Sequence, residues 1–87
     1  MEVRWTDSAQ EHGIPRAQIL YAISHAIGVC EIEGLPNEVT QVFVGYSNEV
    51  DQFLLEVIVA HRPGRYLRIF HANHLTDKFR NIIERTS

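Results

Sequence analysis

The spacing of apolar residues changes once along the chain, and this change constrains the fold more than any other feature of the sequence. Ile19, Leu20, Ile23 and Ile27 recur at intervals of three and four residues, which predicts a helix with one apolar face. From residue 29 the period changes to two: residues 29–33, 40–46 and 66–72 alternate, as is typical of strands with one buried face. Residues 53–61 are instead rich in β-branched and aromatic residues, as is typical of a central strand. The sequence therefore predicts an α+β fold in which helices pack against a sheet.

Turn and capping signals divide the chain into eight expected elements. Thr6, Asp7 and Ser8 are typical of a helix start, and Gly13 and Gly28 stand where helices are expected to end. Short turns between consecutive strands favour antiparallel pairing, so we expect an antiparallel β-meander with the helices packed on one face. The expected order is β-α-α-β-β-β-β-α: a strand at 2–5, helices at 7–12 and 15–27, strands at 29–33, 40–46, 53–61 and 66–72, and a last helix after Thr76.

The 87 residues are enough for one small domain, spanning 1–87, with a thin core. The apolar members of the helical and alternating stripes are the expected core. They are Trp5, Ile19, Leu20, Ile23, Val42, Val44, Leu55, Val57, Ile69 and Phe79.

Several classes of protein find no support in the sequence. The single cysteine, Cys30, excludes an intramolecular disulfide and a cysteine-rich zinc site. The run Val57–Ala60 is too short to span a bilayer, and Met1–Trp5 lacks the features of a signal peptide. No phosphate-binding loop, dinucleotide-binding motif or metalloprotease motif is present. We therefore expect a cytoplasmic protein without a cofactor or a metal.

Charge is divided unevenly along the chain. Residues 1–60 carry two basic and nine acidic side chains, a charge of −7, whereas residues 61–87 carry six basic and two acidic ones, a charge of +4. The two parts account for the net charge of −3. Arg62, Arg65 and Arg68 lie in the basic part, and the planar guanidinium group suits phosphate. These three arginines are therefore candidates for binding phosphate groups.

The segment 65–80 is richest in residues that could act on a phosphodiester. Lys78 and Arg80 stand in the first turn of the expected last helix, where basic residues oppose the helix dipole and a bound anion would explain them. Imidazole can act as both acid and base near neutral pH, so His71 and His74 are candidates for acid–base catalysis. Their spacing of three could also serve a metal, but they straddle an expected strand–helix junction and lack a third ligand. Structural roles for either histidine remain an alternative.

Short motifs near both ends of the chain resemble those of one bacterial family. The run Val3–Asp7 (VRWTD), followed by His12–Ile14 (HGI) before a helix, is similar to that family's Trp-Asp and Lys-His-Gly-Val elements. The run Arg68–Ala72 (RIFHA), followed by Thr76 and Arg80, looks like its Arg-Ile-(Ile)-x-Ala-x-x-x-Thr-x-x-x-Arg segment. The family is the BrnT-like toxins of type II toxin–antitoxin modules, part of the RelE-type toxin superfamily.

This resemblance implies an antiparallel sheet with helices on one side, ribosome-independent endoribonuclease activity and a cognate antitoxin as partner. The chain departs from the family at Ser8, Gln10 and Glu11, where the first helix usually carries basic residues. The candidate catalytic residues are His71, His74, Lys78 and Arg80, in a metal-independent cleavage of RNA.

Two other functions compete with this hypothesis. One is a non-catalytic protein-binding module that keeps the toxin-like fold and partner surface, for which the acidic first part predicts a basic protein partner or a second copy of the chain. The other is an enzyme that acts on a small molecule, a function that no motif in the sequence supports. A short basic DNA-binding protein encoded next to this one would favour the toxin module.

Overall fold

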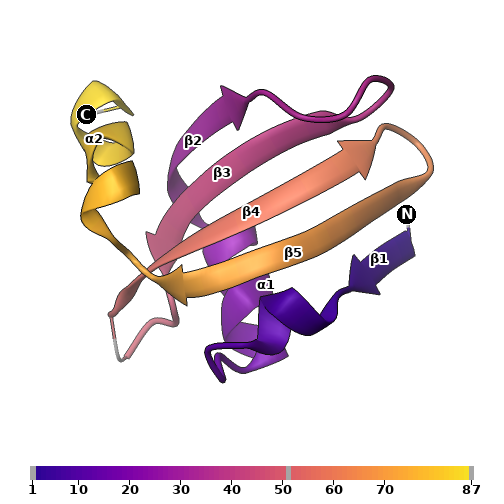
Figure 1. The fold of residues 1–87 in the computed structure, drawn as a ribbon. Coiled ribbons are helices and arrows are strands. Elements are labelled where there is room, and N and C mark those ends of the chain that lie inside the picture. The colour runs from indigo at the N-terminus through magenta and orange to yellow at the C-terminus, as the bar shows by residue number, and fades with distance from the viewer. Residues whose placement is uncertain (1, 51, 87) are drawn as a thin grey trace.

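The computed structural model describes residues 2–50 and 52–86 and shows a sheet of five strands with two helices and one 3-10 turn (Figure 1). In chain order the elements are β1 (Glu2–Trp5), the 3-10 helix η1 (Asp7–Gln10), α1 (Arg16–Ser24), β2 (Ala26–Ile32), β3 (Val39–Tyr46), β4 (Leu54–Arg62), β5 (Tyr66–His74) and α2 (Asp77–Thr86). No helix among these described residues is long and apolar enough to cross a bilayer.

The sheet has the strand order β1-β5-β4-β3-β2 and is mixed (Figure 1). Strands β2 to β5 form the expected antiparallel meander, because short turns join them. β1 pairs in parallel with β5, with Glu2 opposite Tyr66 and Trp5 opposite Ile69, so the expectation of a purely antiparallel sheet is wrong. Since η1 and α1 separate β1 from β2, no tight turn forces β1 to be antiparallel to a neighbour.

The segment after β1 forms one 3-10 turn instead of the expected α-helix. The Thr6 side chain accepts a hydrogen bond from the Ala9 amide, as expected of a helix cap. The Thr6 hydroxyl also donates to the Ile69 carbonyl, and the Ser8 hydroxyl donates to the Phe70 carbonyl. These two bonds hold η1 against β5, beyond the point where β1 ends. A longer α-helix in this place would lose them.

Helix α1 is shorter than expected, because it ends at Ser24 and not at Gly28. The Ser24 hydroxyl donates to the carbonyls of Leu20 and Tyr21, so it satisfies backbone acceptors that are free at a helix end. Gly28 lies instead in β2, where it is buried. The helix packs closely on β3: a Cβ atom at Gly45 would lie 2.3 Å from the Ala22 carbonyl oxygen, so only glycine fits there.

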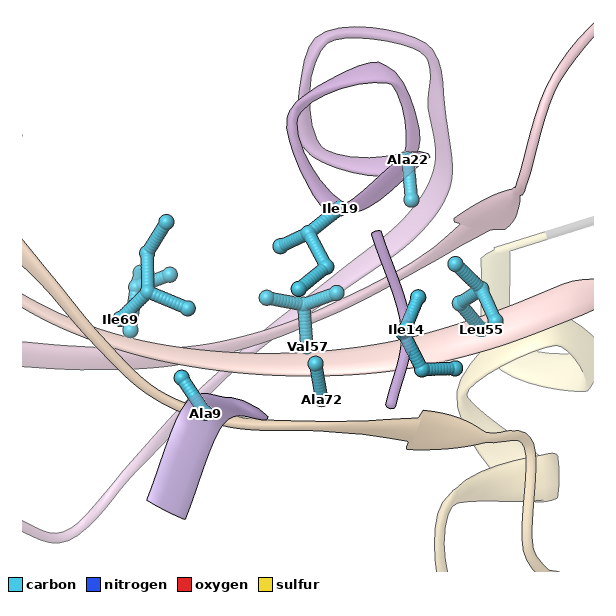
Figure 2. Close-up of a cluster of buried hydrophobic side chains, with 9 residues drawn as sticks. Ala9, Ile14, Ile19, Ala22, Leu55, Val57, Ile69 and Ala72 are labelled. Carbon is cyan, nitrogen blue, oxygen red and sulfur yellow. The ribbon is translucent and has the colours of Figure 1, made fainter. Parts of the chain in front are cut away.

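The two helices cover opposite faces of the sheet, which corrects the expectation that they share one. On the α1 face, buried side chains of alternate strand positions form the main cluster around Ile19 (Figure 2). On the opposite face, called the α2 face, Ile82 of α2 packs with Val42 and Val44 of β3. Alternation along β3 and β4 leaves apolar side chains on both faces, so each face needs its own cover.

The core contains most, but not all, of the expected residues. Fully buried are Ile19, Val42, Val44, Leu55, Val57 and Ile69, while Trp5, Ile23 and Phe79 are half-buried against the clusters. Leu20 was expected in the core and is instead 42% exposed. In α1 the buried positions are Ile19 and Ala22, so Leu20 falls on the outer side of the helix.

Candidate functional site

The α2 face is covered only in part, because α2 packs mainly over β2 and β3 (Figure 1). Over β4, β5 and β1, this face has no helix and carries polar and aromatic side chains. We call this region the open sheet face. Its side chains are Arg4 from β1, Glu56 and Arg62 from β4, Tyr66, Arg68, Phe70 and His71 from β5, and Glu38 from the turn before β3.

Glu56 is a carboxylate buried within the apolar run Leu54–Ala60 of β4, and only 2% of its surface is exposed. One carboxylate oxygen, Oε2, lies 2.8 Å from His71 Nε2. The other, Oε1, accepts from the Thr76 amide at 2.7 Å and from the Thr76 hydroxyl at 2.6 Å. Both oxygens are therefore satisfied, and the carboxylate ties β4 to the residue that precedes α2.

The bond to Glu56 orients the imidazole of His71. Because a carboxylate oxygen accepts, the ring donates from Nε2, and a neutral ring then keeps its lone pair on Nδ1. The His71 side chain is 29% exposed, so solvent and ligands can reach it. A fixed, reachable imidazole of this kind can take or give a proton.

A second histidine lies beside this pair. The ring of His12, from the turn that follows η1, meets the ring of His71 edge to face, with 6.0 Å between the ring centroids. The contact exists because η1 packs along β5 and delivers the turn to the edge of the sheet. The two imidazole rings are therefore in contact, and that of His71 is also hydrogen-bonded to a buried carboxylate.

Toward the other end of β5, Glu38 joins two side chains of that strand. Its carboxylate accepts from the Tyr66 hydroxyl at 2.5 Å and from Arg68 Nη2 at 3.1 Å. The Tyr66 hydrogen bond is the main cause that lowers the pKa of Glu38, and the Arg68 guanidinium adds to it. The same hydrogen bond raises the pKa of Tyr66, since it stabilises the protonated phenol.

Two arginines of this region lie over aromatic rings. The Arg4 guanidinium is 4.2 Å from the centroid of the Tyr66 ring, and the Arg68 guanidinium is 5.3 Å from that of Phe70. Arg4 also pairs with Glu2, and this hydrogen bond is the main cause that raises the pKa of Arg4. Stacking and pairing hold both guanidinium groups against the sheet.

The residues singled out from the sequence fall into two groups at the two ends of β5. Arg62 and Arg65 flank the turn between β4 and β5. Arg68 is the third residue of β5, so it lies close to the same turn. His74 ends β5, and its ring meets Phe53 at 6.0 Å between centroids. Eight residue steps separate Tyr66 from His74, about 27 Å along an extended strand.

The expected convergence of Arg68, Lys78 and Arg80 in one concavity is not seen. Arg68 bonds to Glu38, while Arg80 Nε bonds to Asp77 Oδ1 at 3.2 Å within its own helix. Lys78 is exposed near the start of α2. The described part of the chain contains no pocket, so the site is an open surface.

Sequence reasoning missed several residues of this surface. Glu56 has a visible signal, because it is the one ionisable residue in the apolar run Leu54–Ala60. His12 appears in the motif that resembles the toxin family, but nothing local connects it with His71. Glu38 and Tyr66 are 28 residues apart, so their contact follows only from the register of the sheet.

Among the described residues, no three His, Cys, Asp or Glu side chains are grouped so that they could hold a metal ion. Cys30 is half-buried and packs with the cluster under α2.

Comparison of the chain with protein-family models, with curated proteins and with solved structures finds no match in any of the three. The resemblance to BrnT-like toxins accordingly stays a prediction from the quoted motifs.

Proposed function

We propose that this protein is the toxin of a type II toxin–antitoxin module, an endoribonuclease that cleaves RNA without a metal and without the ribosome. The observation that carries the proposal is the imidazole of His71, oriented by the buried Glu56 and placed next to His12 on the open sheet face. The motifs shared with BrnT-like toxins support the same activity. The cognate antitoxin is the expected protein partner.

In the proposed reaction the 2′-hydroxyl of a ribose attacks the adjacent phosphorus. Nδ1 of His71 takes the hydroxyl proton, while Glu56 holds Nε2–H and stabilises the imidazolium that forms. His12, protonated, gives its proton to the departing 5′-oxygen. The P–O5′ bond breaks as the P–O2′ bond forms, which yields a 2′,3′-cyclic phosphate and a 5′-hydroxyl end.

Cationic side chains on either side of the histidines would bind the RNA backbone. Arg62, Arg65 and Arg68 approach from the β4–β5 turn, and Lys78 and Arg80 lie near the start of α2. Positive charge on both sides lets an extended strand of RNA run along β5 across His71.

The experiment is induction of the chain in a bacterial host, together with an RNA-cleavage assay on the purified protein. Wild type should arrest growth and cleave RNA, and His71→Ala or His12→Ala should lower the cleavage rate by about 10²- to 10⁴-fold, the usual effect of losing a general acid or base. His25→Ala is the matched control, because His25 is exposed and stacks on Tyr21 at the end of α1.

Purified protein that leaves RNA intact, or a His71→Ala variant as active as wild type, would overturn the proposal. Circular dichroism on each variant separates lost chemistry from lost folding. Glu56→Gln should reduce the rate less than His71→Ala does, because the amide oxygen can still accept from His71.

A non-catalytic protein-binding module is the second candidate, and the pairing of charges favours it. Arg4, Arg68 and Arg80 of the described surface each bond to a carboxylate. The outer strand β2 exposes Ile27 and Val29 beside an unpaired strand edge, which could accept a partner strand or a second copy. Light scattering of the chain alone and coexpressed with the product of a neighbouring gene tests this: a 10 kDa particle in both samples would contradict it.

A further inference from the structure

The ion pair between Glu38 and Arg68 crosses a whole strand. Glu38 directly precedes Val39 of β3, whereas Arg68 belongs to β5, and β4 lies between these two strands. The residue of β4 opposite Arg68 is Ala60. Because its side chain is only a methyl group, the carboxylate and the guanidinium can meet above it.

The backbone before Glu38 is shaped to place this carboxylate on the open sheet face. Asn37 has φ of 70°, in the left-handed region that asparagine tolerates better than most residues. The Glu38 amide donates to the Leu35 carbonyl, which closes the turn. A Cβ atom at Gly34 would lie 2.0 Å from the Thr40 hydroxyl oxygen, so the start of this turn also lies tightly against the sheet.

Three arginines surround Glu38 on this face, and one of them, Arg4, is also paired with Glu2. Arg4 pairs with Arg68 in the register of β1 and β5, and Arg62 stands opposite Tyr66 in the register of β4 and β5. Arg4 and Arg68 each lie over an aromatic ring, which leaves the edges of the guanidinium groups able to donate. Arg4 and Arg68 both act electrostatically on Glu38, and Arg62 acts on Tyr66.

We propose that the Glu38 carboxylate occupies a phosphate-binding site formed by Arg4, Arg62 and Arg68, and that a phosphate group of single-stranded RNA displaces it. This inference rests on the proposed function, since it concerns how the same face binds its substrate. A carboxylate and a phosphate present similar oxygens to a guanidinium group, so the two compete for the same donors. The free protein thus holds its own weak competitor, and affinity for RNA is set by the strength of that contact.

The test measures binding and not cleavage. A fluorescein-labelled single-stranded deoxyoligonucleotide of eight thymidines has no 2′-hydroxyl, so the proposed nuclease cannot cut it. Glu38→Gln keeps the size of the side chain and its acceptor for Tyr66 but removes the charge that competes with phosphate. Fluorescence anisotropy should show about fivefold tighter binding than wild type, the factor that corresponds to a partly exposed ion pair.

A matched control separates this effect from net charge. Glu31→Gln makes the same change in charge at an exposed position of β2, and it should shift the affinity by less than twofold. Tyr66→Phe removes only the hydroxyl that donates to Glu38, and it should tighten binding by a smaller factor than Glu38→Gln. Adding Arg68→Ala to Glu38→Gln should abolish the gain.

Inorganic tripolyphosphate, added as a competitor, identifies the recognised group. If tripolyphosphate competes more strongly in Glu38→Gln than in wild type, phosphate alone is recognised. If Glu38→Gln raises only the affinity for the oligonucleotide, the nucleotide backbone is needed. Both outcomes agree with the proposal. Equal effects of Glu38→Gln and Glu31→Gln, or no measurable binding in any variant, would overturn it. A failed nuclease assay leaves these binding results unaffected, so the two proposals fail separately.

Discussion

The two faces of the sheet are made from the same strands but have different contents. On the α1 face, Leu55, Val57 and Val59 of β4 are fully buried among apolar neighbours. On the α2 face, the intervening residues of the same strand include Glu56, which is bonded to His71 and Thr76. Alternation along one strand thus separates a face that stabilises the fold from a face that presents polar groups.

The comparison shows how a thin domain can bury a carboxylate. No buried side-chain nitrogen or oxygen within the described residues lacks a hydrogen-bond partner. Glu56 meets this condition through three donors, two of them from Thr76, so the cost of burying its charge is offset locally. The buried polar groups of the α2 face therefore form a hydrogen-bonded network. Single substitutions can test what each of its residues contributes.

The largest expected effect is on the α1 face. Leu55→Ala should lower the free energy of unfolding by roughly 2–5 kcal/mol, since Leu55 is fully buried and its loss leaves a cavity. Leu54→Ala is the comparison on the α2 face of the same strand, where the side chain is only half-buried, and it should cost less. Urea denaturation measures both, and equal losses would show that the two faces do not differ in packing.

The next effect concerns the buried carboxylate. Glu56→Ala leaves the Thr76 amide and hydroxyl without their acceptor, and it should lower the free energy of unfolding by about 1–3 kcal/mol. Glu31→Ala, at an exposed site of β2, should change it by less than about 0.5 kcal/mol. If both variants unfold at the same urea concentration as wild type, Glu56 has no role in holding α2.

A smaller effect should appear in the pH dependence of stability. The pKa of Glu38 is lowered from its usual 4.5, first by the hydrogen bond from Tyr66, so the folded state favours the ionised form. The resulting stabilisation is fully present above pH 4.5 and is lost as the pH falls through the lowered pKa. Thermal unfolding of wild type and Glu38→Gln should therefore differ at neutral pH and converge in acid. A constant difference between the two would contradict the assignment.

The smallest effect is spectroscopic. The pKa of Tyr66 is raised above the usual 10.0, because its hydroxyl donates to Glu38. In an absorbance titration at alkaline pH, Tyr66→Phe should lose a phenol that ionises above pH 10.0, and Glu38→Gln should move that ionisation back toward 10.0. The stability that the bond supplies is present below pH 10.0 and is lost as the phenol ionises. Identical titrations of wild type and Glu38→Gln would show that the bond is absent in solution.

Much of the local structure was accessible from the sequence. The alternation over residues 40–46 and 66–72 and the turn signals between them predicted β3 and β5 to within two residues. Thr6 was recognised as a cap, and the basic turn around Arg62 and Arg65 was expected between two strands. These features depend on neighbours within a few residues, which is the range over which periodicity and capping act.

The sequence by itself determined the α+β composition, the meander and most of the buried positions, because each follows from the local spacing of apolar side chains. Only the tertiary structure decided that β1 lies parallel to β5, that the helices take opposite faces, and that His12, Glu56 and His71 meet. Those outcomes join residues 15 to more than 60 positions apart, such as Glu56 with His71 and Glu2 with Tyr66. Strand register and face choice set such contacts, and both depend on the free energy of packing the whole sheet and not on any short stretch of chain.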